Sequence, residues 1–126
     1  MTRKVVVVYE SDISSSIEQG LEYSCPAKYS VICVDSGKKC FELLERSDSV
    51  PDIILLEITM SDMNGWEIFD RLKSNPRWSS IPIVFMSGRT DRVAQSTGSF
   101  LGEDYIVKPF EIMDLKERID KVLKQN

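Results

Sequence analysis

Short apolar runs alternate along the chain with longer amphipathic stretches, and the alternation continues from the first residues to the last. The apolar runs are rich in β-branched residues and are bounded by turn-forming residues, which is typical of strands. They predict strands at residues 5–8, 29–34, 53–56, 81–86 and 105–107. Strands that alternate with helices in this way indicate βα units around a parallel sheet.

The intervening stretches carry apolar residues at helical spacing. One helix is predicted to begin at Asn64 or Gly65, and the last helix has a single apolar stripe, formed by Ile112, Leu115, Ile119, Val122 and Leu123. Residues 89–99 contain several poor helix formers, so we expect a short or irregular fourth helix there. Strict alternation of strands and helices predicts one α/β domain over residues 1–126, a doubly wound five-stranded parallel sheet with five helices.

Composition removes several classes of function. Because the chain has no histidine, Ser-His-Asp and Cys-His catalysts and His-containing zinc sites are excluded. The net charge of −4 argues against a nucleic-acid surface. Three cysteines, Cys25, Cys33 and Cys40, show no C-x-x-C spacing, so we interpret them as free thiols. The valine run near the N-terminus is too short for a signal peptide or a membrane span, so a cytoplasmic location is expected.

Candidate chemistry gathers where the predicted strands end, because the functional crevice of a doubly wound sheet lies at the carboxyl ends of its strands. The residues at these ends are Tyr9, Glu10, Glu57, Ser87, Gly88 and Lys108. Glu10 and Glu57 are oxygen ligands of the kind that hold Mg²⁺. Lys108 can neutralise a phosphate and Ser87 can donate a hydrogen bond to one. The constellation, more than any one residue, indicates a metal or phosphate site.

Three ordered segments, at 51–65, 81–88 and 104–110, resemble the motifs of response-regulator receiver domains in two-component signalling, which have a flavodoxin-like architecture. The resemblance runs from about residue 4 to residue 123. It implies that Glu57 occupies the place of the aspartate that accepts a phosphoryl group from a histidine kinase. The resemblance assigns the other roles as phosphate contacts to Ser87 and Lys108, a main-chain metal ligand to Thr59, and the switch aromatic to Tyr105.

The chain departs from the family pattern at its most demanding positions. Tyr9 and Glu10 stand where the family has two acids that position Mg²⁺, and Ser61 replaces the usual proline. The extra methylene of Glu57 moves its carboxylate by roughly 1.5 Å, judged from standard bond lengths. A misplacement of about that size can slow phosphoryl transfer on the order of a hundredfold. We therefore expect that no cofactor is required and that Mg²⁺ binding is weakened.

Three interpretations of Glu57 follow. It can mimic a phosphoryl group partially, since a carboxylate has one negative charge against nearly two. It can be a structural acid paired with Lys108 and never switched. Alternatively, phosphorylation is retained on Glu57 or on a nearby acid such as Asp62 or Asp12.

Tyr9 either plugs the vacated metal site or packs as a strand-end aromatic. Among the other aromatic side chains, Trp66 is expected at the pocket edge and Trp78 beneath a connecting loop.

A flavin or nucleotide enzyme is the rival class, because residues 11–16 place hydroxyls at a helix start where an anion can bind. The segment has no glycine, however, and Glu10 and Asp12 repel a phosphate. We therefore predict a non-enzymatic pseudo-receiver that contacts a histidine kinase, an output domain or another signalling protein. Its contact face is expected on the fourth helix, the fifth strand and the fifth helix, with neither nucleic acid nor membrane as a partner.

Overall fold

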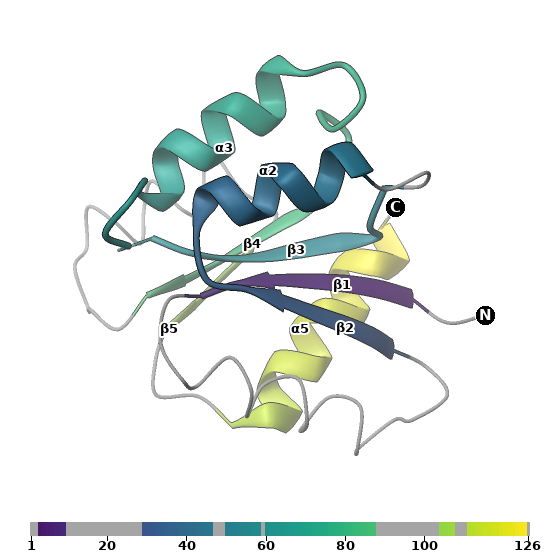
Figure 1. Ribbon diagram of the computed structural model, residues 1–126. Coiled ribbons are helices and arrows are strands. Elements are labelled where there is room, and N and C mark those ends of the chain that lie inside the picture. Colours follow the sequence, from purple (N-terminus) through teal and green to yellow (C-terminus); the bar gives the residue numbers. More distant parts are fainter. Residues whose placement is uncertain are drawn as a thin grey trace.

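The computed structural model describes residues 3–9, 29–46, 50–58, 60–87, 104–107 and 111–125. Their framework is a parallel sheet in the strand order β2-β1-β3-β4-β5 (Figure 1). The strands are β1 (Arg3–Val8), β2 (Tyr29–Val34), β3 (Ile53–Glu57), β4 (Ile83–Ser87) and β5 (Asp104–Val107). The order reverses at β1, which lies between β2 and β3, so the edge at the ends of β1 and β3 is the topological switch point.

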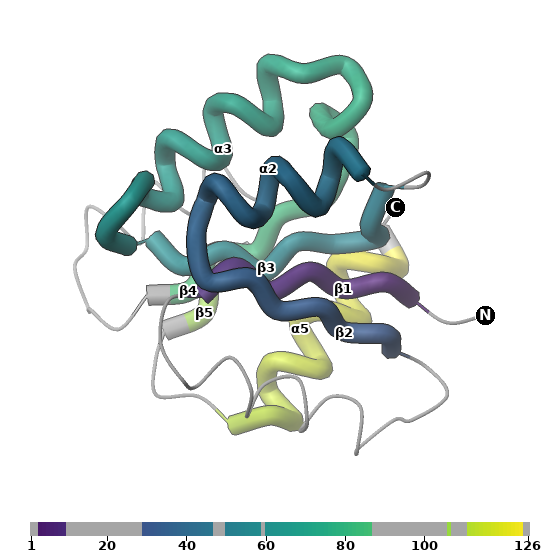
Figure 2. Tube along the Cα trace, in the orientation of Figure 1, coloured from purple at the N-terminus to yellow at the C-terminus, as the bar shows by residue number. Residues whose placement is uncertain are grey.

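Helices cover both faces of this sheet. The described helices are α2 (Gly37–Arg46), α3 (Gly65–Ser74) and α5 (Ile112–Gln125). Figure 1 shows α2 and α3 on one face and α5 on the other, and the Cα trace in Figure 2 shows the same layers. The predicted parallel α/β architecture is thus confirmed. The two helices expected after the first strand and at 89–99 lie outside the described residues, so the count of five helices stays a prediction.

The core consists of two apolar layers that the sheet separates. Along β1, Val5 and Val7 pack with the α5 side, whereas Val6 and Val8 pack with the α2 and α3 side. All four valines are fully buried, as expected for a central strand whose side chains alternate between two covered faces. On α5 the predicted stripe is buried at Leu115, Ile119, Val122 and Leu123 and partly buried at Ile112.

The α3 helix begins and ends at local sequence signals. The Asn64 side-chain oxygen accepts a hydrogen bond from the Glu67 main-chain nitrogen at 3.0 Å, which satisfies one of the donors left open at a helix start. At the other end the Asn75 nitrogen donates to the Leu72 carbonyl at 3.3 Å, and Pro76 follows. The predicted start at Asn64 or Gly65 is therefore confirmed.

The fourth strand differs from the predicted 81–86, because β4 begins two residues later. Pro82 has no N–H to donate to a strand ladder, and the Ile81 nitrogen donates instead to the Trp78 carbonyl at 3.1 Å. The Lys73 ammonium donates to the carbonyls of Ser79 and Ile81 at 3.0 and 3.2 Å. These bonds hold residue 81 in the turn that precedes the strand.

Candidate functional site

The carboxyl ends of the strands meet at one edge of the sheet. The register places Val8 beside Leu56, Glu57 beside Met86 and Ser87 beside Val107. Two main-chain bonds extend this edge, because the Tyr9 nitrogen donates to Val34 at 3.0 Å and the Ile58 nitrogen donates to Met86 at 3.1 Å. Tyr9, Glu57 and the main chain of Ser87 therefore occupy neighbouring strand ends, as the sequence predicts.

The remaining predicted site residues fall outside the described residues. Glu10 follows Tyr9 in the chain, Thr59 follows Ile58, and Lys108 follows the last residue of β5. For Tyr105 the structure describes the main chain, which pairs with Phe85 in the β4–β5 ladder. The roles that the resemblance gives to these residues stay predictions.

Glu57 is the buried charged side chain of the described residues, with 4% of its surface exposed. It is the last residue of β3, a strand whose five residues are all buried. Burying a carboxylate costs free energy unless neighbouring groups stabilise its charge. An acid at this position therefore requires such stabilising groups around it. Burial also limits the approach of a small molecule to its oxygens.

Gly65 fixes the path of the chain after Glu57. Its nitrogen donates to the Ile58 carbonyl at 2.7 Å, which closes the loop between β3 and α3. A Cβ atom at residue 65 would lie 2.6 Å from the Glu57 carbonyl oxygen and 2.8 Å from the Ile58 Cα, so only glycine fits without a main-chain shift. Sequence reasoning placed Gly65 at a helix start but did not find this close approach, which depends on where α3 docks.

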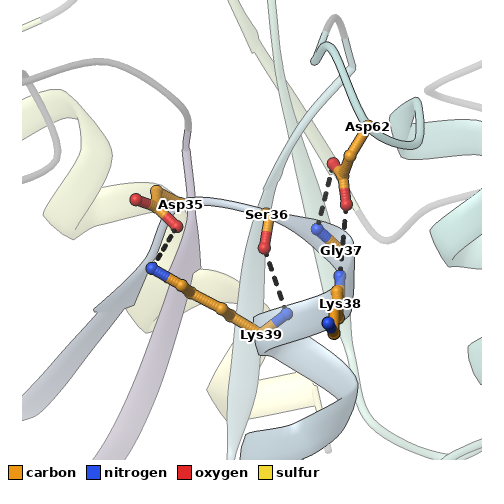
Figure 3. A network of polar contacts seen from close by, with 6 residues as sticks. All are labelled: Asp35, Ser36, Gly37, Lys38, Lys39 and Asp62. Carbon is orange, nitrogen blue, oxygen red and sulfur yellow. Dashed lines mark hydrogen bonds and ion pairs between the residues drawn. The ribbon is translucent and has the colours of Figure 1, made fainter.

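The same loop is bound to α2 through Asp62. The Asp62 carboxylate accepts hydrogen bonds from the main-chain nitrogens of Gly37 and Lys38, both at 3.3 Å (Figure 3). A carboxylate at a helix N-terminus complements the helix dipole and satisfies open N–H groups. The sequence suggested Asp62 as an alternative acceptor acid, and the structure adds a structural contact that joins residues 25 positions apart.

The α2 start has its own local bonds beside Asp62. The Ser36 hydroxyl accepts from the Lys39 nitrogen at 3.1 Å, in the manner of an N-cap, and the Lys39 ammonium lies 3.1 Å from the Asp35 carboxylate (Figure 3). The ion pair is exposed and contributes little to stability. Asp62 is therefore the contact in this network that links α2 to the loop following Glu57.

Tyr9 is a core side chain as well as a strand-end residue. It has 4% of its surface exposed and belongs to the apolar cluster on the α5 side, with Val7, Leu55 and Leu115 among its members. This burial favours the interpretation of Tyr9 as a packed aromatic. The helix predicted after the first strand, on which a strand-end aromatic would pack, lies outside the described residues.

Both tryptophans lie on the α2 and α3 side of the sheet. The Trp66 ring is partly buried and its centroid lies 4.7 Å from that of Phe85, the middle residue of β4. Trp78 is buried in the turn between α3 and β4, with its ring 5.7 Å from the Phe41 ring on α2. Trp78 therefore packs beneath the connecting turn, as expected, and also beneath α2.

The described residues supply only part of a magnesium site. No group of three acidic or cysteine side chains gathers within the described ranges. Of the predicted donors, Glu57 offers a carboxylate, whereas Tyr9 offers a phenol from an apolar cluster in place of an acid. Mg²⁺ prefers carboxylates, carbonyls and water in octahedral geometry, so the described donors do not complete its shell.

In the same ranges, no helix combines the length and apolarity needed to cross a bilayer.

A parallel sheet in this strand order, with a buried acid at the end of its central strand and at the topological switch point, defines an α/β protein of flavodoxin-like architecture. The comparison with family models agrees: the response regulator receiver domain matches residues 5–120. The chain belongs to this family, and its class of function is two-component signal transduction.

Relatives and solved structures place the chain in the same group. It is 31% identical over 122 residues to the transcriptional regulatory protein CrdR of Helicobacter pylori, which covers 94% of this chain and 54% of that protein. It is 35% identical over 92 residues to a protein of Vibrio cholerae named a probable cyclic di-GMP phosphodiesterase, covering 72% of this chain and 20% of that one. The chain thus spans between a fifth and about half of these relatives.

Structural similarity extends over nearly the whole chain. The crystal structure of the chemotaxis protein CheY4 from Vibrio cholerae superposes with a TM-score of 0.85 at 20% identity, covering 97% of this chain and 99% of that one. At this identity the likeness establishes the fold alone. Whether the acceptor position is phosphorylated has to be argued from the residues of this chain.

Proposed function

We propose that residues 1–126 form one receiver domain that signals through protein contact without phosphorylation of an aspartate. The observation that carries the proposal is the place of Glu57, which ends β3 with 4% of its surface exposed. In this proposal Glu57 stands at the family's acceptor position. The partner is a histidine kinase, an output domain or another signalling protein. Ser87, Lys108 and Tyr105 would keep their family roles as contacts and switch residue only if the pocket still responds.

Phosphoryl transfer to Glu57 is disfavoured by position and by access. In-line attack depends on the placement of the attacking oxygen, and an extra methylene shifts that oxygen by roughly 1.5 Å. Such a shift can slow the reaction on the order of a hundredfold. Because Glu57 is buried, a phosphodonor must also displace the groups that cover it.

Metal assistance is weakened in the same proposal. An acid that would position Mg²⁺ is replaced by Tyr9, whose ring lies in the apolar cluster on the α5 side. When bound, Mg²⁺ would supply charge neutralisation for the transferring phosphoryl group. Glu10, Glu57 and the Thr59 carbonyl are the residues proposed to hold it, and they provide fewer anionic ligands than the family pattern.

Without phosphorylation, Glu57 acts in one of two ways. As a permanent carboxylate it mimics a phosphoryl group partially, with one negative charge against nearly two. As a structural acid paired with Lys108 it holds a single conformation that partners recognise. A Glu57→Gln variant removes the charge in both cases, but the readouts differ. Partner affinity falls if Glu57 is a mimic, whereas an unswitched scaffold loses the pair with Lys108, so its free energy of unfolding falls while the folded domain still binds the partner.

The second candidate function is a conventional phosphorylated receiver. Asp62 favours it, since its carboxylate is exposed and follows Glu57 by five residues in the same loop. The contacts of Asp62 with the α2 amides argue against this role, because a phosphoryl group there would have to compete with the existing bonds. Phosphorylation of Glu57 itself belongs to the same alternative.

The deciding experiment is incubation with Mg²⁺ and acetyl phosphate, followed by intact-mass measurement. A conventional receiver domain, labelled in parallel, shows that the donor is active. We expect no added phosphoryl group on the wild-type domain and a gain of labelling in Glu57→Asp, which shortens the acceptor side chain to the family's length. A labelled wild-type domain would overturn the proposal, and loss of the label in either Glu57→Gln or Asp62→Asn would identify the acceptor.

A further inference from the structure

A groove runs between α2 and α3 on the face of the sheet opposite α5. It has a volume of about 530 Å³. Its apolar lining consists of Phe41, Met63 and Trp78, and its polar lining consists of Lys38, Glu42, Glu45, Arg71 and Asn75. Figures 1 and 2 show α2 and α3 lying side by side over the sheet, and the lining residues on α2 extend from Lys38 to Glu45. A helix of ten residues, the length of α2, is about 15 Å long.

The apolar lining is anchored in the core beneath it. The Trp78 side chain is 5% exposed and packs against Phe41, while Phe41 and Met63 are only partly buried against the same cluster. The Arg71 guanidinium lies 6.0 Å from the centre of the Phe41 ring, near the limit of a cation–π contact. The groove therefore has an apolar base that is continuous with the core beneath α2 and α3.

The two sides of the groove differ in charge, because two acids and one base, Lys38, line it on α2, whereas Arg71 lines it on α3. Glu42 and Glu45 are exposed on α2, where their i, i+3 spacing puts them on one face of the helix. Within the described part of the chain, neither carboxylate forms an ion pair, and the same holds for Arg71 on α3. Two acids that are free to pair lie on one side, and a guanidinium lies on the other. A complementary partner carries basic residues opposite the acids and an acidic residue opposite the guanidinium.

We propose that this groove binds an amphipathic helix of a protein partner, with lysine or arginine facing Glu42 and Glu45 and an acid facing Arg71. Apolar side chains at i, i+4 and i+7 of that helix cover Phe41, Met63 and Trp78. Laying an apolar helix face into a groove between two helices is a recurrent recognition mode. Complementary charges at the rim of such a contact set its register and speed its association.

Other ligand classes fit the charges less well. A nucleic acid or a small anion finds no basic excess there, because Glu42 and Glu45 offset Lys38 and Arg71 in the lining. A second copy of the chain could offer α5, which carries the exposed Met113 together with several lysines. The groove is also joined to the loop after Glu57, because Asp62 binds the Lys38 amide and precedes Met63 in the chain. The proposal nevertheless holds whether or not Glu57 accepts a phosphoryl group, so the labelling experiment above does not test it.

The test is a selection from a displayed library of 14-residue helical peptides with randomised faces. The bait is the whole 126-residue chain. We expect enriched sequences to combine apolar residues at i, i+4 and i+7 with lysine or arginine on one flank. A synthetic peptide of the enriched sequence should bind about tenfold more weakly to Glu42→Lys/Glu45→Lys, because two rim contacts become repulsive. Glu117→Lys, an exposed charge reversal on α5, is the matched control and should bind like wild type.

Amide chemical-shift mapping with the enriched peptide provides the second readout. Shifts should concentrate on α2 and α3 in the wild-type domain. The proposal is overturned if no helix is enriched, if enriched helices are acidic or uncharged, if the double variant binds as well as wild type, or if the shifts map to α5. Sedimentation of the free domain completes the test: a concentration-dependent dimer that Glu42→Lys/Glu45→Lys dissolves would show that a second copy occupies the groove.

Discussion

The Asp62 carboxylate lies 3.3 Å from the main-chain nitrogen of Gly37 and thereby ties the loop after Glu57 to the first turn of α2. The Lys38 nitrogen donates to the same carboxylate. Gly37 also packs closely under α3, because a Cβ atom there would lie 3.1 Å from Ile68 and 3.2 Å from Met63. The β3–α3 loop and the start of α2 are therefore one packed unit (Figure 3).

Replacing Asp62 should loosen this unit. We expect Asp62→Ala to lower the free energy of unfolding by about 1 kcal/mol, the usual effect of losing a helix-capping acceptor. Asp62→Asn keeps an acceptor oxygen but loses the charge that complements the helix dipole, so it should cost about half as much. Urea denaturation gives both values. Equal stability of wild type and Asp62→Ala would contradict a capping role, and Asp70→Ala, on the exposed face of α3, is the control for losing a surface acid.

Gly65 should tolerate no side chain. In Gly65→Ala the new methyl group would meet main-chain atoms of Glu57 and Ile58 at under 3.0 Å, and main chain cannot rotate away. We expect a loss of about 2 kcal/mol or more, in the range of core overpacking. Gly37→Ala is the matched control, because its nearest neighbours lie at 3.1–3.2 Å and the nearest of them, the Ile68 Cδ1, is the end of a side chain that can shift. Thermal and urea unfolding should rank the two variants, and a Gly65→Ala variant as stable as Gly37→Ala would refute the tight contact.

The Cys40 thiol should be unreactive until the domain unfolds. Burial raises the pKa of Cys40 from its ordinary value of 9.0 to about 12. At pH 8 only about one thiol in ten thousand is then the thiolate that reacts with alkylating reagents. Iodoacetamide labelling followed by peptide mass spectrometry should modify the partly buried Cys33 first and Cys40 only in denaturant. Labelling of Cys40 at the rate of Cys33 in the folded domain would contradict its burial.

The same shift predicts a loss of stability in alkaline solution. A thiol whose folded pKa is above its unfolded value favours the folded state fully below pH 9.0, and this contribution disappears as the pH rises towards 12. Cys40→Ala removes the titrating group. The difference in unfolding free energy between wild type and Cys40→Ala should therefore be constant below pH 9.0 and shrink above it.

The parts of the structure that periodicity controls were predictable from the sequence. The buried valines of β1 and the stripe on α5 follow from the spacing of apolar residues, because a strand or helix between two layers must bury those positions. The location of Glu57 at a strand end follows from the same pattern. The start of β4 was predicted two residues too early, since an apolar residue before Pro82 reads as strand although its N–H is used in a turn.

Contacts between distant segments were not predictable in the same way. The role of Asp62 depends on the position of α2, and the requirement for glycine at residue 65 depends on how closely α3 approaches β3. Neither the Asp62 contact nor the glycine requirement has a signal in the neighbouring sequence, because both arise only when whole helices and strands dock together. The burial of Tyr9 belongs to the same group: its place after β1 is local, but its packing with Leu115 arises from the position of α5.

Tyr9 sets a limit on how far the acceptor pocket can be restored by substitution. Tyr9→Asp would supply the missing family acid but would place a carboxylate in the cluster that holds Val7 and Leu115. We expect a loss of roughly 3 kcal/mol or more, because aromatic packing is removed and a charge is buried. Tyr9→Phe keeps the ring and should lose less than about 1.5 kcal/mol. Urea unfolding of both variants measures the effect on stability. Acetyl phosphate labelling of each variant in a Glu57→Asp background measures the effect on phosphorylation. If Tyr9→Asp is as stable as Tyr9→Phe, the ring does not support the core, and Tyr9 then acts at the pocket itself.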